Sequence, residues 1–192
     1  MSKHDKALRQ HGGPVVHEAT ETQPTTYESD CYVTPAETVA LVREAFGGTI
    51  DVDPFAGDTA THATVNFRYP QQDGLKDSWG PPGTRAYVNP PFSGEWKKLI
   101  INKIVAERAR GIDTILLLPS GIVGSEAGEM VLGQCDAACF LSKRVRFFLN
   151  GKRASAPRNG TLLIFFGCAL GSGVFARALD RLGVGVVLRR LS

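Results

Sequence analysis

The sequence lacks any apolar run long enough to cross a membrane. Its longest apolar stretches, Ile115 to Leu118 and Leu162 to Phe166, are far shorter than the roughly 20 residues that a membrane-spanning helix needs. The polar N-terminus also lacks the apolar region of a secretory signal peptide. We therefore expect a cytoplasmic protein.

Cysteine is scarce, and its spacing does not fit a zinc site. None of the four cysteines belongs to a C-x-x-C pair, and no histidine follows them at zinc-finger spacing. They are Cys31, Cys135, Cys139 and Cys168. Because free cysteine behaves as a small apolar side chain, we expect buried, reduced thiols and no metal site.

The N-terminal 29 residues have little aliphatic periodicity. They are rich in Thr, Glu, Gln and Gly, and their three histidines have nothing rigid to fix a metal geometry. The 192 residues, 43% of them hydrophobic and 21% charged, suffice for one core but not for two ordinary domains. We predict a disordered tail over residues 1–29 and a single domain over residues 30–192.

Strands alternate with helices along the rest of the chain. A helix is predicted over residues 36–46, with Thr34 as its N-cap, Pro35 as its first residue and Gly47-Gly48 as its stop. A second helix is predicted from Glu95 to Arg110, ended by Gly111. Strands are predicted over 49–53, 85–88, 114–118, 137–141, 161–166 and 184–188. This order indicates an α/β sheet, parallel for most of its width, with ligands bound beyond the carboxyl ends of its strands.

The turn Asn89-Pro90-Pro91-Phe92 follows one of these strands. Two consecutive prolines fix the backbone and remove two N–H groups, which leaves a rigid array of acceptors. The Asn89 side-chain oxygen and the Pro90 carbonyl can accept hydrogen bonds from one NH₂ group, while the Phe92 ring lies against a flat heterocycle. Two such acceptors can stabilise the positive charge that develops on an exocyclic amine as a methyl group arrives. Proline-rich turns after strands are usually structural, but a following aromatic residue and a second acidic strand-end turn favour the catalytic interpretation.

Several ordered motifs resemble the phage-type Dam family of DNA N6-adenine methyltransferases, which are Rossmann-like enzymes that use S-adenosylmethionine. The resemblance runs from about Asp30 to Phe166. Its motifs are Asp30 to Pro35, Phe46-Gly47 with Asp51 to Pro54, Asp73-Gly74-Leu75 with Trp79, Asn89 to Ser93 with Trp96, and Arg146-Phe147 with Ala156-Pro157. It implies an abbreviated methyltransferase sheet with helices on both faces, and, with the chain size, a phage or prophage protein acting in the bacterial host cell.

The resemblance also implies roles for individual residues. Asn89, Pro90, Pro91 and Phe92 would hold the flipped adenine as catalytic residues. Asp53 and the small turn after it would line the methionine end of the cofactor, and Asp73 would meet an amine or a ribose hydroxyl of the cofactor. The turn consists of Pro54, Phe55, Ala56 and Gly57. Tyr32, Thr34 and Pro35 would close over the cofactor from the N-terminal side.

The spacing departs from larger relatives of this class. Asp53 and Asn89 are only 36 positions apart, which leaves room for one abbreviated crossover. The two further strands that usually lie there, and the acidic residue that holds the cofactor ribose, are not identifiable.

Basic charge concentrates late in the chain. The stretch from 143 to 158 contains six cations and no Asp or Glu, and its Gly151 and 154–157 segment predict a loop. The cations are Lys143, Arg144, Arg146, Lys152, Arg153 and Arg158. A solvated face is one explanation; phosphate contact with DNA is the other, because an enzyme that extracts a base must grip the duplex.

Three alternatives remain open at this point. The same tetrapeptide could act on an RNA base or on a protein glutamine, although the basic stretch favours nucleic acid. The chain could also be a catalytically silent DNA-binding module of the same fold.

Overall fold

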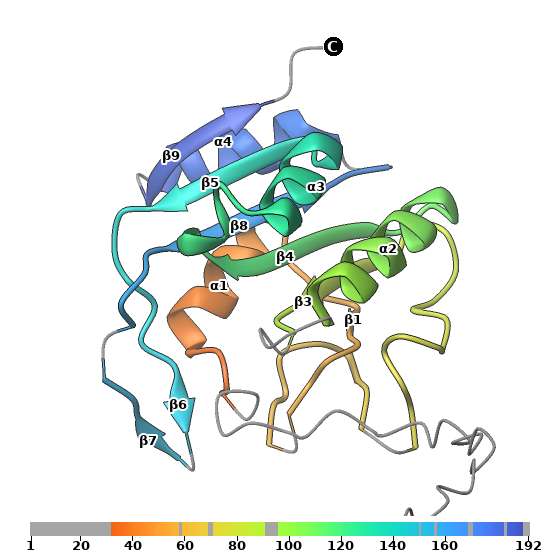
Figure 1. Cartoon of the computed structure of the whole chain (residues 1–192). Helices are drawn as coiled ribbons and strands as arrows, with labels where there is room; N and C mark the ends of the chain where they lie inside the picture. Colours follow the sequence, from red (N-terminus) through yellow and green to blue (C-terminus); the bar gives the residue numbers. More distant parts are fainter. Residues whose placement is uncertain are drawn as a thin grey trace, which may run out of the picture.

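The computed structural model describes residues 32–57, 59–68, 71–90, 96–149, 151–155, 157–168, 171–182 and 184–189. A seven-stranded sheet in the order β2-β1-β3-β4-β8-β5-β9 forms the centre of the molecule, and a separate hairpin, β6-β7, projects from it (Figure 1). The sheet strands are β1 (Val52–Asp53), β2 (Val65–Asn66), β3 (Arg85–Val88), β4 (Asp113–Pro119), β5 (Ala137–Leu141), β8 (Thr161–Phe166) and β9 (Gly185–Arg189). The hairpin strands are β6 (Phe148–Leu149) and β7 (Lys152–Arg153). The helices are α1 (Ala36–Ala45), α2 (Trp96–Ala109), the short 3₁₀ helix η2 (Ser120–Ile122), α3 (Glu126–Gln134) and α4 (Ser172–Leu182).

The sheet is mixed, with a parallel half and an antiparallel half. Strands β2, β1, β3 and β4 are mutually parallel, while β8 is antiparallel to both of its neighbours, β4 and β5. Strand β5 therefore runs in the same direction as β4, and β9 is antiparallel to β5. The predicted α/β sheet is confirmed, but it is mixed rather than parallel for most of its width, because three of its six neighbouring strand pairs are parallel and three are antiparallel.

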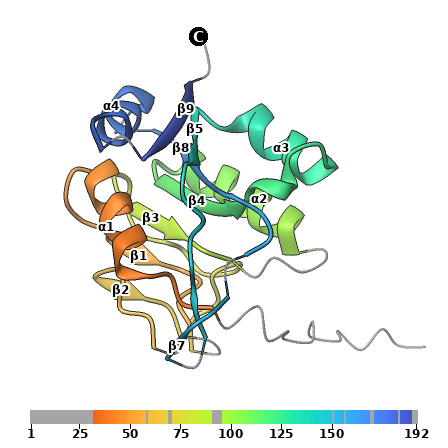
Figure 2. The ribbon, with the colours of Figure 1, turned by 90° about the vertical axis from the view of Figure 1, so that its left-hand side faces the viewer.

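Helices α1 and α4 cover one face of the sheet (Figure 2). Val39 and Val42 of α1 and Phe175 of α4 pack against side chains that alternate along the strands, among them Tyr87 and Phe165. The Phe165 and Phe175 rings are stacked with 5.2 Å between their centroids. Since β3 contributes Tyr87 to this face, its neighbours Ala86 and Val88 belong to the opposite face.

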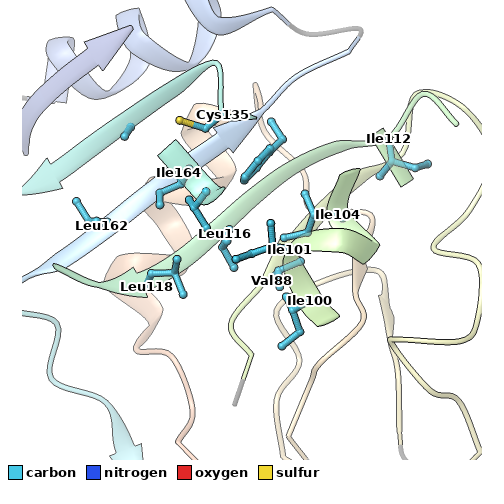
Figure 3. Packing of buried hydrophobic residues seen from close by; sticks show 14 of the residues in the cluster. Val88, Ile100, Ile101, Ile104, Ile112, Leu116, Leu118, Cys135, Leu162 and Ile164 are labelled. Carbon is cyan, nitrogen blue, oxygen red and sulfur yellow. The ribbon is translucent and has the colours of Figure 1, made fainter. Parts of the chain in front are cut away.

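Helices α2 and α3 cover the opposite face. Ile100, Ile101 and Ile104 of α2 pack with Val88 and Leu116 of the sheet (Figure 3). Burying a side chain of this size stabilises the fold by about 1.5–3 kcal/mol. The predicted helices on both faces are confirmed.

The predicted span of α1 is confirmed to within one residue at each end, but its predicted N-cap is wrong. Gly47 and Gly48 have φ of 79° and 131°, in the region that favours glycine, and they end the helix. Pro35 is the N-cap, with no side-chain capping bond, whereas Thr34 was expected to cap and Pro35 to be the first helical residue. The Thr34 hydroxyl instead forms hydrogen bonds with the side chains of Tyr87 in β3 and of Asn89, which directly follows β3.

Three further sequence predictions need correction. Strand β2 adds to the outer side of β1, where no strand was expected. The stretch from 143 to 158 contains a β-hairpin rather than only a loop, because Gly151 at φ 72° allows a tight turn between β6 and β7. Cys135 and Cys139 are buried as predicted, but Cys168 is exposed. The tail predicted over residues 1–29 lies outside the described residues.

Among the residues described here, no helix combines the length and apolar character that crossing a membrane requires.

Candidate active site

Asn89 follows β3 directly, at the carboxyl end of the parallel part of the sheet. Its Nδ2 donates a hydrogen bond to the Thr34 hydroxyl oxygen at 3.1 Å and lies 3.5 Å from the Tyr32 carbonyl oxygen. Pro90 beside it is buried. The N-terminal segment and the end of β3 therefore meet at the Asn89 amide, although they are more than 50 positions apart in the sequence.

The oxygen of the same side-chain amide differs from its nitrogen. Asn89 Oδ1 is buried and has no hydrogen-bond partner among the described residues. Leaving a buried acceptor unpaired costs about 1–3 kcal/mol of free energy, so a ligand that donates a hydrogen bond to such a group can bind favourably there. The role of Asn89 as an acceptor for an NH₂ group stays a prediction. Pro91 and Phe92, predicted to complete the catalytic turn, lie outside the described residues.

Thr34 connects Asn89 to the interior of the sheet. Its hydroxyl oxygen lies 2.8 Å from that of Tyr87, and both residues are buried, at 3% and 0% exposure. Burial raises the pKa of Tyr87, against the lowering effect of the bond to Thr34, so the phenol stays protonated. Thr34 therefore contacts both Asn89 and Tyr87. The next residue, Pro35, is buried at the start of α1.

Asp53 ends β1, the strand next to β3. It is 2% exposed, and its carboxyl accepts a 3.1 Å hydrogen bond from the Phe55 backbone N–H. Burial raises the pKa of Asp53 to about 7, whereas the Phe55 N–H and the Arg68 charge act in the opposite direction. A carboxyl group near its titration point at the carboxyl end of a strand is a candidate for ligand contact.

The turn after Asp53 packs against a second loop, residues 73–79, called here the bracing loop. Pro54 is buried, whereas Phe55, Ala56 and Gly57 are partly exposed. Gly74 packs so closely that a Cβ there would lie 2.2 Å from the Pro54 carbonyl oxygen. The Trp79 indole donates to the Gly74 carbonyl at 2.8 Å and meets the Phe55 ring edge-on, with 6.2 Å between centroids. These contacts fix the backbone of the predicted cofactor turn.

Asp73 makes local contacts. Its Oδ1 accepts the Leu75 N–H at 2.9 Å, and its Oδ2 lies 3.7 Å from the Lys76 ammonium. These bonds form a turn that precedes Gly74 and Trp79. Asp73 therefore stabilises the bracing loop, and its predicted contact with the cofactor stays a prediction.

The six predicted DNA-binding cations are all exposed, and they surround the hairpin β6-β7. A hollow of about 430 Å³, called here the basic hollow, is lined in part by four of them and by Pro35 and Glu37 of the α1 start. The four are Lys143, Arg144, Arg146 and Arg153. Lys152 and Arg158 do not line it. Because Pro35 follows Thr34 directly, the basic hollow lies next to the segment that holds Asn89.

The hairpin is attached to that same segment. Val33 and Phe148 of β6 exchange two backbone hydrogen bonds, at 2.8 and 2.9 Å. Tyr32 packs on Phe147 with 6.0 Å between ring centroids, and the Arg153 guanidinium lies over the Phe148 ring and pairs with Glu37 of α1. The structure thus brings together Tyr32, Thr34, Asn89 and the basic hairpin.

Two residues of the site were missed in the sequence. Tyr87 was treated only as part of an apolar strand, although a buried tyrosine hydroxyl needs a partner and so gave a signal. His62 carried no such signal; it lies half-buried against Tyr87, with 6.2 Å between ring centroids. Burial lowers the pKa of His62, and the nearby Arg43 and Arg68 lower it further, so the ring is kept neutral.

The chain matches a known protein family. A family model described as DNA N-6-adenine-methyltransferase (Dam) matches residues 21–169, which include Asp53, Asn89 and the basic hairpin. No curated protein matches the chain.

Proposed function

This chain belongs to the Dam family of DNA N-6-adenine-methyltransferases, and on that premise we propose that it transfers a methyl group from S-adenosylmethionine to the N6 amine of adenine in DNA. The observation that carries the proposal is the buried Asn89 Oδ1 at the end of β3, which has no partner in the described part of the chain. An amine hydrogen of the base would satisfy it.

Asn89 and Pro90 act on the amine in this proposal. The lone pair of an aromatic exocyclic amine is delocalised into the ring, which makes the nitrogen a poor nucleophile. Acceptors at Asn89 Oδ1 and the Pro90 carbonyl hold the amine hydrogens and stabilise the positive charge that the nitrogen gains as its bond to carbon forms. Pro91 would make the turn rigid, and Phe92 would lie against the base.

The residues at the end of β1 fit S-adenosylmethionine. When bound, this cofactor supplies a methyl group that its sulfonium charge activates for transfer. Its ammonium and ribose hydroxyl groups are donors, and the buried Asp53 carboxyl is an acceptor with one hydrogen bond from Phe55. The small side chains of Ala56 and Gly57 would let the ligand approach the backbone, as glycines do in dinucleotide-binding turns. Tyr32, Thr34 and Pro35 would close the site from the N-terminal side.

The basic hollow supports DNA as the substrate. Duplex DNA is held mainly through its phosphates, and a base must leave the stack before its amine can reach a pocket. The cations at the hairpin lie beside the segment that contacts Asn89, where phosphates flanking an extruded base would pass. This charge, together with the family, favours DNA over a protein glutamine. The RNA alternative shares the same phosphate chemistry.

Mass spectrometry of nucleosides tests the proposal. DNA, RNA and protein fractions are incubated separately with the full chain and S-adenosylmethionine, and the Asn89→Ala variant serves as the matched control. N6-methyladenine should appear in DNA with the unaltered chain and not with the variant. Methylation confined to RNA or protein would replace DNA as the substrate, and DNA binding without any methylation would indicate a silent module.

A further inference from the structure

The side-chain amide of asparagine has two ends of nearly identical shape but opposite hydrogen-bonding character. The oxygen only accepts and the NH₂ only donates, so a half turn about the last bond exchanges an acceptor for a donor. An asparagine that must present its oxygen to a base therefore needs its NH₂ end fixed by other groups. At Asn89 these groups are the Thr34 hydroxyl at 3.1 Å and the Tyr32 carbonyl at 3.5 Å, the second of which can only accept.

Thr34 is itself held in place. Its hydroxyl would rotate freely on a surface, but here it is 3% exposed and lies 2.8 Å from the hydroxyl of Tyr87, which is fully buried. The Tyr87 ring is packed in the core between the sheet and helices α1 and α4, so its hydroxyl is a fixed point. A chain of two hydrogen bonds, one buried and one partly buried, thus runs from the core to the Asn89 amide, whose Oδ1 has no partner in the described part of the chain.

We infer that Thr34 and Tyr87 are positioning residues that fix the orientation of the Asn89 amide and so make the site select a base with an amine over one with a carbonyl at the same ring position. The inference rests on the proposed function for the identity of the base. Adenine presents an NH₂ donor at C6, whereas hypoxanthine presents an oxygen. With the amide fixed, Oδ1 faces that oxygen, and two acceptors are left unpaired. With the amide free to turn, Nδ2 can donate to the hypoxanthine oxygen.

The first test observes the amide in the protein without ligand. In ¹⁵N-labelled full chain, the Asn89 side-chain signal is assigned by its loss in Asn89→Asp, and the exposed Asn159 serves as the internal reference. The Asn89 amide protons should exchange with water about five- to tenfold more slowly than those of Asn159. Thr34→Val should remove this protection, and Thr34→Ser, which keeps the hydroxyl, should retain it. Protection that is absent in the native chain, or unchanged in Thr34→Val, overturns the inference.

The second test measures selectivity. Duplexes carry adenine or hypoxanthine at the position that the unaltered chain methylates, and their affinities are compared. The preference for adenine should fall about tenfold in Thr34→Val and in Tyr87→Phe, and Thr34→Ser should restore it. A purely structural role would weaken both duplexes equally and leave the ratio unchanged, which would also overturn the inference.

The two tests separate this inference from the proposed function. If the unaltered chain methylates no adenine, the proposed function fails, and amide exchange, measured also in Tyr87→Phe, still decides whether Thr34 and Tyr87 hold Asn89. If adenine is methylated but the preference for adenine over hypoxanthine is the same in the unaltered chain, Thr34→Val, Thr34→Ser and Tyr87→Phe, only the inference fails.

Discussion

The backbone N–H of Phe55 donates a hydrogen bond to the Asp53 carboxyl at 3.1 Å, in a position where Asp53 is only 2% exposed. One such bond does not replace the hydration that a carboxylate loses on burial, and the pKa of Asp53 accordingly rises to about 7. The folded protein therefore keeps a proton on Asp53 in a range of pH where the unfolded chain has already lost it.

Asp53→Asn should change how stability depends on pH. The pKa of the carboxyl is about 3.8 in the unfolded chain and about 7 in the folded one, so native stability is greatest below the lower value and is lost as pH rises towards the upper one. The asparagine variant cannot ionise. Its stability relative to the native protein should rise by up to roughly 4 kcal/mol between about pH 4 and pH 8. Urea unfolding at several pH values measures this, and parallel curves for the two proteins would contradict it.

Asp53→Ala should weaken S-adenosylmethionine binding. If the ionised carboxyl contacts the cofactor, the affinity of the native protein rises as pH increases through about 7, and the alanine variant loses this dependence. Calorimetry of both proteins at about pH 6 and pH 8 provides the measurement. An unchanged affinity would mean that the cofactor does not contact the end of β1.

Asn89→Ala should abolish methyl transfer while cofactor affinity stays within a few fold. The side chain is proposed to contact the amine in the transition state, and loss of one such oriented polar group costs about 10²–10³ in kcat. Turnover with tritiated cofactor and calorimetry give the two quantities. Near-normal turnover would remove the acceptor mechanism.

Replacing Arg144 and Arg146 by alanine should reduce the salt dependence of DNA binding. Log affinity falls with log salt by about 0.9 for each phosphate neutralised, so loss of two contacts makes the slope shallower by roughly 2. Arg177→Ala with Arg181→Ala is the charge-matched control, since these exposed residues line a different hollow with Gly47 and Gly48. If only the control variant changes the slope, the DNA surface lies near α4.

Gly74→Ala and Gly57→Ala should separate stability from binding. A Cβ at Gly74 meets the Pro54 carbonyl oxygen at 2.2 Å, so the turn must shift, and we expect a loss of about 1–3 kcal/mol in unfolding free energy. A Cβ at Gly57 meets nothing within 4 Å, so stability should be nearly unchanged while cofactor affinity falls. Thermal unfolding and calorimetry distinguish the two; equal stability of both variants would contradict the close contact at Gly74.

The parts of the fold that could be predicted were those with a strong local pattern. Strands β3, β5 and β8 have the predicted bounds, because each is a short apolar run between polar or glycine-containing turns. Strand β2 was missed because it has two residues, and its Val65 is exposed. Helix α3 was also not predicted, although its start carries a recognisable residue: the Ser125 side chain caps the helix by accepting a hydrogen bond from the Gly128 N–H.

The site was predicted only in part for a different reason. Asn89 and Asp53 were identified because strand-end turns carry recognisable residues. Thr34 was assigned to a helix cap and, through the family resemblance, to the cofactor, yet its bonding partners Tyr87 and Asn89 lie more than 50 positions away. Such a hydrogen bond depends on how the sheet packs against α1. The local sequence can show that a buried hydroxyl needs a partner, but it does not show which residue that partner is.

Strand β8 lies between β4 and β5 in the sheet although it follows both of them in the chain. Strands β4 and β5 each pair with it and not with each other. Its Leu162 and Ile164 belong to one hydrophobic cluster, and its Leu163 and Phe165 belong to the other. In a growing polypeptide, the facing edges of β4 and β5 therefore lack a partner and both clusters are incomplete until Thr161 to Phe166 has left the ribosome. Insertion of this strand joins the two halves of the sheet, and α4, which follows it, then completes the second cluster with Phe175 and Leu179.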